Sequence, residues 1–245
     1  PINRRGRIMA FIAGKNSGVL FGAFDLTSYF NNFSFSRDTN AITTTMFGDD
    51  NESYIAGVDT STIDISGLFD GGTDAVDEEL ANAFSVTTAT PLTVFQNGTT
   101  AGEPCVLLDS KIQNYTIDSS VSDAVAVSSQ FTGNNFGRGL SLYALTNTSA
   151  TDTTTAVDFG SSTTFGGQAF IHITAHSSAN IAVKLQSSAD NASFADVTGG
   201  AFTAITGTGS ERIAPTGTIN RYVRLVITVT SGSATFQVSF SPNKK

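Results

Sequence analysis

The sequence of 245 residues has little of several residue types on which chemistry or cross-linking depends. It contains no tryptophan, one cysteine, two histidines and five prolines. A lone cysteine, Cys105, forms neither an intrachain disulfide nor a cysteine metal site, so we expect a buried, inert thiol. No apolar run approaches the roughly 18 residues of a transmembrane helix. These absences exclude a disulfide scaffold and predict no membrane span.

Basic residues are also scarce, with 13 Lys and Arg against 21 Asp and Glu and a net charge of −8. Residues 8–142 hold four basic and sixteen acidic residues, whereas residues 1–7 hold three arginines. High-affinity phosphate binding needs clustered Lys and Arg, so an acidic body of this kind repels nucleic acid. We read residues 1–18 as an extended arm with a basic start.

No catalytic or metal-binding constellation stands out. His172 and His176 are expected on one strand and one face, roughly 13 Å apart, which is too far for a single metal ion. We interpret both as solvent-facing. The acidic residues of 49–52 do not have the spacing of an EF-hand loop, and nucleotide-binding glycine motifs are absent. The sequence therefore predicts no enzyme activity, no cofactor and no metal.

What the sequence has is a composition typical of β-structure: 34 Thr, 28 Ser, 19 Phe and 23 Gly. Apolar residues alternate along many segments. Residues 221–230 and 234–240 alternate in this way, and Ser231-Gly232-Ser233 between them predicts a hairpin turn. Residues 168–176 and 180–187 are likewise expected as two short strands.

One segment departs from alternation. Residues 74–84 place Val76, Leu80 and Phe84 at spacings of four, with Thr73 as the expected N-cap and acidic residues in the first turn. This predicts one amphipathic helix whose apolar stripe lies on a sheet and whose carboxylates face solvent. The fold class is therefore all-β with one short α-helix.

The polar stretch 146–156 has no apolar periodicity and is expected to be a linker. The charge balance changes across it. We expect an acidic first domain at residues 1–145 and a near-neutral β-sandwich at residues 157–245.

The order of short motifs in residues 23–57 carries a resemblance to a known family. A strand start at Asp25-Leu26-Thr27 is followed by Phe33-Ser34-Phe35-Ser36-Arg37. A threonine-rich core, Thr44-Thr45-Met46-Phe47-Gly48-Asp49, comes next, and then Tyr54 and Gly57. This order resembles the major tail tube proteins of long-tailed, siphovirus-type bacteriophages. The likeness extends over roughly residues 20–143, and residues 157–245 resemble added β-sandwich domains of some phage tail proteins.

The resemblance implies a structural subunit of the virion tail tube, made in the cytoplasm of the bacterial host. Its subunits would form hexameric rings that stack into a tube, and a β-barrel shared by the ring would surround a lumen through which DNA passes without specific binding. Tape-measure and tail-terminator or tail-tip proteins would be further partners. The helix would pack outside the barrel, and residues 157–245 would hang on the outer surface.

The resemblance also implies which residues touch neighbouring subunits. The N-terminal arm and a loop at about residues 37–57 would join stacked rings. The candidates for these contacts are Arg4, Arg5, Arg7, Arg37, Thr44, Phe47, Asp49, Asp50 and Tyr54.

An alternative function remains open at this point. The chain would then be a phage decoration or adhesin protein whose C-terminal domain binds host-surface glycans. The polar turn at Asp190-Asn191, with Phe194 as the stacking aromatic residue, would form the edge of that site.

Overall fold

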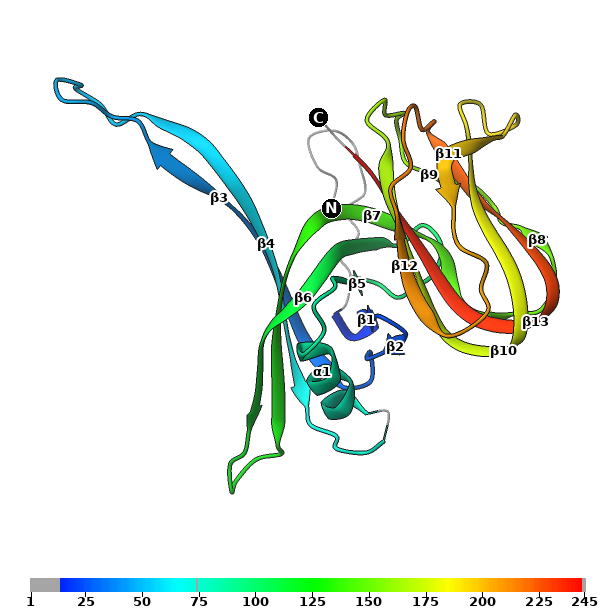
Figure 1. Cartoon of the computed structure of the whole chain (residues 1–245), viewed down its shortest axis with the longest axis horizontal. Helices are drawn as coiled ribbons and strands as arrows, with labels where there is room; N and C mark the ends of the chain where they lie inside the picture. The colour runs from blue at the N-terminus through cyan, green and yellow to red at the C-terminus, as the bar shows by residue number, and fades with distance from the viewer. Residues whose placement is uncertain (1–13, 74, 244–245) are drawn as a thin grey trace, which may run out of the picture. The chain divides into compact units, whose positions relative to one another are not determined.

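The computed structural model describes residues 14–73 and 75–243, and it confirms an all-β chain with one short α-helix. After a 3₁₀ turn (Gly14–Asn16), the elements follow in chain order: β1 (Gly18–Phe21), β2 (Phe24–Asp25), β3 (Phe30–Thr43), β4 (Tyr54–Leu68), α1 (Val76–Phe84), β5 (Thr90–Phe95), β6 (Pro104–Asp118), β7 (Ala126–Thr148), β8 (Asp152–Thr153), β9 (Val157–Asp158), β10 (Gly167–Ser188), β11 (Ala195–Ala201), β12 (Gly209–Ile213) and β13 (Tyr222–Pro242). Figure 1 shows them along the chain.

The strands belong to two compact units. Unit 2 consists of Ser28–Leu92 and Leu108–Phe136. Unit 1 consists of three parts: the described residues before Ser28, the segment Thr93–Leu107, and the described residues from Gly137 onward. Strands β5, β6 and β7 therefore contribute to both units. The segment 146–156, expected as a linker, includes the end of β7 and strand β8, which pairs with β13. Unit 1 thus contains residues from both sides of the segment 146–156.

Unit 1 is organised by two long, bent strands. β10 and β13 pair antiparallel from Gly167↔Pro242 to Ser188↔Tyr222 and curve together (Figure 1). The two halves of each strand enclose one hydrophobic core, because alternate side chains point inward on both sides of the bend. That core includes Ile171, Ile181, Val183, Leu185, Leu225, Ile227, Phe236, Val238 and Phe240.

The predicted hairpin within β13 is wrong, and so is the division of β10 into two strands. Ser231-Gly232-Ser233 does not reverse the chain but forms an irregularity opposite another in β10 at Ser177–Asn180. Gly232 has a φ of 65°, and a Cβ built on it would lie 2.3 Å from the Ser177 carbonyl oxygen. The inward-facing residues of β13 have odd numbers before the bulge and even numbers after it. A bulge therefore bends the paired strands where the sequence suggested a turn.

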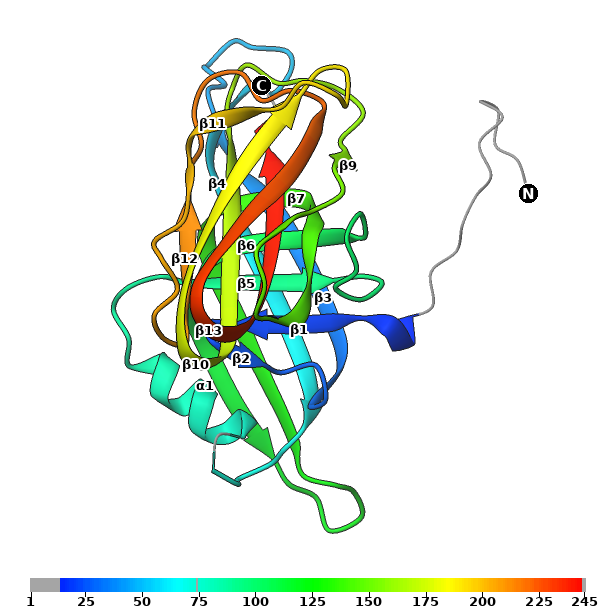
Figure 2. The ribbon, with the colours of Figure 1, turned by 90° about the vertical axis from the view of Figure 1, so that its right-hand side faces the viewer.

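The first half of β10 is covered on both faces. Ile171 points into the core just described, while Phe170 belongs to a second cluster with Leu20, Phe95, Cys105 and Leu107. Figure 2 shows β1 and β5 running crosswise to β10 and β13 in this unit. His172 lies on the same side as Phe170 and is completely buried, so its expected solvent-facing position is wrong. His176 is half-buried.

Unit 2 contains a sheet in which β4 pairs with β3 on one side and with the first part of β7 on the other. β6 follows β7 in the strand order. One face of this sheet is apolar and buried, with Ile63, Ile65, Val127 and Phe131. Val76 and Leu80 of α1 are also buried, as the helical spacing of four predicted.

The helix differs from its prediction at its start and on its polar side. It begins at Val76 after the N-cap residue Ala75, and no side chain caps it, so the cap predicted at Thr73 is wrong. Glu79 is 7% exposed although we expected solvent-facing carboxylates. Residues three apart share a helix face, so Glu79 lies on the same side as Val76.

Candidate functional site: a projecting hairpin and a polar sheet face

The first candidate feature is a long β-hairpin in unit 2. β3 and β4 pair from Phe30↔Gly67 to Thr43↔Tyr54, with one irregularity between Thr39 and Ala41. Figure 1 shows the far part of this hairpin projecting from the rest of the unit. The segment 37–57, expected as a loop, is therefore mostly paired strand, and only residues 44–53 connect the two strands.

The connecting segment is held by its own polar groups. Thr44 N–H donates to the Ser53 carbonyl at 2.8 Å, and Ser53 N–H donates to the Thr45 hydroxyl at 2.9 Å. Asp49 Oδ2 accepts from Met46 N–H at 2.8 Å, while Asp49 N–H donates to the Met46 carbonyl at 3.1 Å. Asp49 thus shapes the tip, in the way that Asp side chains form local turns. These hydrogen bonds define the conformation of the tip.

Several large apolar side chains of the hairpin face solvent. Phe47 is fully exposed, Met46 is 76% exposed and Val58 is 79% exposed. Contiguous exposed apolar surface on a soluble protein marks an interaction site more often than a scattered residue does. The tip residues named from the resemblance lie within or beside this surface: Thr44, Phe47, Asp49, Asp50 and Tyr54.

The predicted arginines are placed differently. Arg37 lies lower on β3 and pairs with Asp59 of β4 within the hairpin, at 2.5 Å. Hydrogen bonds from Thr39 and then from Arg37 hold the pKa of Asp59 below its ordinary value. Arg4, Arg5 and Arg7 lie outside the described residues. The structure therefore brings together the tip candidates and sets Arg37 apart from them.

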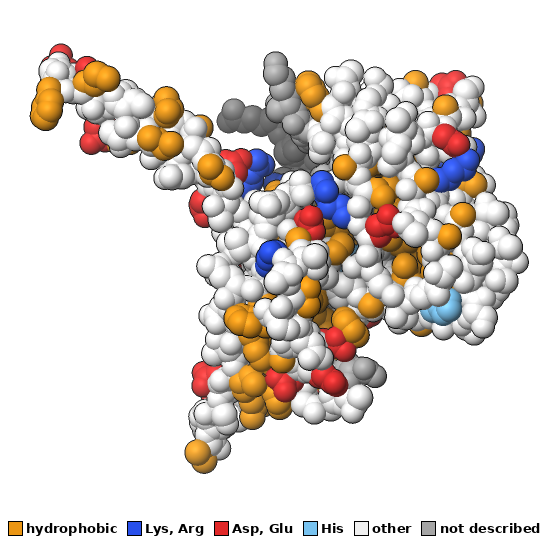
Figure 3. Space-filling model, viewed as in Figure 1, with side chains coloured by type: hydrophobic (Ala, Val, Ile, Leu, Met, Phe, Trp, Pro, Cys, Tyr) orange, Lys and Arg blue, Asp and Glu red, His pale blue; other side chains and the backbone are white. Residues whose placement is uncertain are grey.

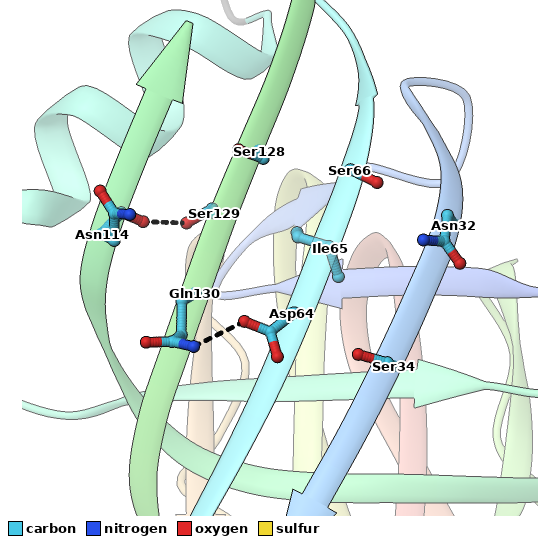
Figure 4. A pocket seen from close by; sticks show the side chains of 9 residues that line it. All are labelled: Asn32, Ser34, Asp64, Ile65, Ser66, Asn114, Ser128, Ser129 and Gln130. Carbon is cyan, nitrogen blue, oxygen red and sulfur yellow. Dashed lines mark hydrogen bonds between the residues drawn. The ribbon is translucent and has the colours of Figure 1, made fainter.

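The second candidate feature is the polar face of the unit 2 sheet. Cross-strand pairing aligns its side chains in rows: Asn32, Ser66 and Ser128; Ser34, Asp64 and Gln130; Ser36, Thr62 and Thr132. Gln130 Nε2 donates to Asp64 at 2.7 Å, and the Ser36 and Thr62 hydroxyls are 2.6 Å apart. Thr132 donates to Gln113 of β6 and so continues the third row onto a fourth strand. Figure 4 shows part of this face, which forms a shallow, open pocket of about 190 Å³.

Sequence reasoning did not single out this polar face. The signal was present as strict alternation, because Ser34 lies between Phe33 and Phe35, and Asp64 lies between Ile63 and Ile65. Period-two alternation puts one set on each face of a strand. The sequence alone does not show which strands pair so that their polar faces align.

The sheet of unit 2 also has free edges. β3 pairs only with β4 among the described strands. At the other side, β5 reaches only the first part of β6, since the Ser110 hydroxyl contacts the Thr90 carbonyl at 3.1 Å and β5 begins at Thr90. Residues 111–118 of β6 extend beyond β5, so no described strand pairs with their outer edge. Unpaired edges of this kind are templates for pairing with another chain.

Unit 1 carries a separate surface feature at the predicted glycan turn. Asp190 accepts backbone N–H groups from Ala192 and Ser193, which lower its pKa to about 2. The Arg224 guanidinium lies 3.9 Å from the centre of the Phe194 ring. Arg224 thus covers one face of the Phe194 ring, which we expected to stack on a glycan. The hydrogen bonds to Asp190 account for the conformation of the turn.

Within the described residues, no group of three or more His, Cys, Asp or Glu side chains gathers as a metal site would need. The helices there are all too short or too polar to span a membrane.

No protein-family model matches the chain, and no curated protein matches it. Solved structures match with low identity. The SPP1 tail tube has 12% identity, a TM-score of 0.43 and coverage of 52% of this chain and 78% of its own. The SPP1 Dit protein, described as a hub adsorption apparatus protein, has 13% identity, a TM-score of 0.39 and coverage of 93% and 99%. A chain of the native gene transfer agent virion has 13% identity, a TM-score of 0.40 and coverage of 50% and 93%.

Proposed function

We propose that the protein is a structural subunit of a bacteriophage tail tube of the siphovirus type, in which hexameric rings stack around a DNA conduit. One observation carries the proposal: unit 2 combines a four-stranded sheet that has three polar cross-strand rows on one face, two free edges and a projecting apolar hairpin. A subunit that worked alone would have to protect such edges and such a hairpin from other chains.

The free edges support closure into a ring. In the proposed ring, the outer edge of β3 in one subunit pairs with residues 111–118 of β6 in the next. Repetition around the ring produces a closed barrel, and closure removes every unpaired edge. The apolar face with Ile63, Ile65 and Phe131 stays buried within each subunit, so the polar face is left to line the lumen.

The composition of that face supports passage of DNA without retention. Its rows contain hydroxyl and amide side chains, with Asp64 as their one charged residue. Without a cluster of Lys or Arg there is little to neutralise phosphates, so a duplex is not held. The acidic charge of residues 8–142 predicted repulsion of nucleic acid by the body of the protein, and we now propose a lumen wall that is chiefly neutral. Much of the acidic charge lies elsewhere, as with Asp49, Asp50 and Glu52 at the hairpin tip.

The other parts of the proposal follow the resemblance. The hairpin tip and the N-terminal arm make contacts between stacked rings, α1 lies outside the barrel, and residues 157–245 form an outer domain. Tape-measure and terminator or tip proteins bind the ends of the tube. The protein acts in the virion tail as a structural component and not as an enzyme.

Electron microscopy of the purified full chain tests this function. We expect rings with a central hole, or tubes, and native mass spectrometry should give multiples of six subunits. A protein that stays monomeric at high concentration and across salt and pH conditions would contradict the proposal.

A further inference from the structure

Large exposed hydrophobic residues are distributed unevenly over the described chain. Twelve are exposed, and eleven of them belong to unit 2. Six lie on the β3–β4 hairpin: Ile42, Met46, Phe47, Tyr54, Ile55 and Val58. The other five, which we call the base patch, are Leu68, Phe84, Val86, Ile117 and Val121. Figure 3 shows hydrophobic side chains along the hairpin and again at the far end of the same unit.

Strand pairing and hydrogen bonds connect several segments of the base patch. Leu68, at the end of β4, pairs with Ala126 at the start of β7, and Phe69 N–H donates to the Val125 carbonyl at 3.0 Å. Tyr115 of β6 donates to Asp77 of α1, which ties the helix to the strand that carries Ile117. Val121 lies in the turn between β6 and β7 and is fully exposed. These contacts place Leu68, Ile117 and Val121 together at one end of the unit.

The two apolar surfaces lie at opposite ends of one strand. β4 begins beside the hairpin tip at Tyr54 and ends in the base patch at Leu68. Fifteen extended residues span roughly 45 Å, so the tip of a subunit does not reach its own base patch. Identical copies arranged in one direction instead bring the tip of each subunit to the base of the next. Such a head-to-tail contact repeats without limit and builds a filament.

Resting on the proposed tube function, we infer that the base patch of one subunit is the receiving surface for the hairpin tip of a subunit in the adjacent ring. Met46 and Phe47 of the tip pack on Leu68, Ile117 and Val121 of the other copy. Both surfaces lose their exposed apolar area, and the ends of the tube are left with one open tip ring and one open base ring.

The charges around this contact make a distinctive prediction. The tip carries Asp49, Asp50 and Glu52, and the base end carries Asp118 and Asp123. Like charges repel across the contact, and salt screens this repulsion while the apolar packing remains. Stacking should therefore increase with sodium chloride from about 0.02 to 0.5 M, as measured by sedimentation of tubes. A contact based on ion pairs would weaken with salt, and that result would overturn the inference.

Two charge substitutions test the head-to-tail arrangement. Phe47→Asp destroys the tip and keeps the base patch, whereas Val121→Asp destroys the base patch and keeps the tip. Each variant alone should form rings that do not stack. Because one intact tip and one intact base remain, a mixture of rings prepared separately should form double rings and stop there. Phe165→Asp, at an exposed residue of unit 1, is the control and should leave tube length unchanged.

The outcomes separate this inference from the proposed function. If Val121→Asp still forms full-length tubes, the base patch is not the receiving surface, although the tube function stands. If the unsubstituted protein forms neither rings nor tubes, the tube function itself fails. Cross-linking supplies an independent readout. In tubes, Phe47→Cys combined with Val121→Cys should form intersubunit disulfide ladders, while Phe47→Cys combined with Phe165→Cys should not. Ladders only in the second pair would overturn the inference.

Discussion

At the scale of single residues, His172 links three segments of unit 1. Its Nδ1 lies 2.9 Å from the Gly22 carbonyl oxygen, and its Nε2 lies 2.8 Å from the Thr93 hydroxyl. The ring therefore donates from Nδ1 and accepts at Nε2 in its neutral form. Burial lowers the pKa of His172 from 6.5 to about 4. This histidine joins β10 to β5 and to the β1–β2 turn.

The lowered pKa predicts a pH-dependent stability. Between pH 6.5 and 4 the unfolded chain binds a proton at this position and the folded chain does not, so stability falls as the pH decreases through that interval. The loss is on the order of 3 kcal/mol. His172→Gln should be less stable at pH 7 and should show a shallower decline from pH 6.5 to 4, as measured by urea unfolding. Equal slopes for both proteins would contradict this role.

Cys105 predicts a chemical difference between folded and unfolded chains. The thiol is buried, and burial raises its pKa to about 12. The thiolate is the reactive form, so the native protein should react with a thiol reagent only after opening. We expect negligible labelling of the folded protein over an hour at pH 8 and complete labelling in urea. Rapid labelling without denaturant would show that the thiol is accessible.

At the scale of elements, the bulge in β13 predicts a specific cost of substitution. Gly232→Ala must adopt a positive φ and also place a Cβ against the Ser177 carbonyl. Gly217→Ala is a matched control, because Gly217 has a φ of 76° but open space around the Cβ position. The positive φ alone costs roughly 1–2 kcal/mol. Gly232→Ala should cost at least about 1 kcal/mol more in thermal or urea unfolding, and equal losses would argue against the bulge.

The same elements indicate how much of the fold could be predicted from the sequence. Alternation correctly identified β-strands around Ile63 and Val223, and helical spacing identified α1, because both patterns record which side of an element is buried. A hairpin turn was expected at Ser231-Gly232-Ser233 because a turn and a bulge both use a glycine at positive φ. His172 was misplaced because alternation cannot show that the second face of β10 is also covered. The hairpin was located through the resemblance, but its exposed apolar surface became evident only in three dimensions.

At the scale of the whole molecule, the proposed barrel predicts which residues face the lumen. Cysteines at Ser34 and Ser128, on the polar face, should react in assembled tubes with a small maleimide but resist a maleimide carrying a large polymer. Ala81→Cys on α1, proposed to lie outside, should react with both reagents. Dissociated subunits should react at all three positions. Labelling of Ser34→Cys in tubes by the large reagent would place this face on the outside.

The composition of the two units has a consequence for synthesis in the cell. Unit 2 is complete once residue 136 has been made, but unit 1 needs β13, whose neighbours include both β7 and β10. At about 5–20 residues per second, a ribosome needs roughly five seconds or more to pass from β7 to the end of β13. During that interval, Phe95, Cys105 and Leu107 lack their cover from Phe170. A prematurely terminated chain thus keeps an apolar surface exposed, which makes it a substrate for proteases and chaperones.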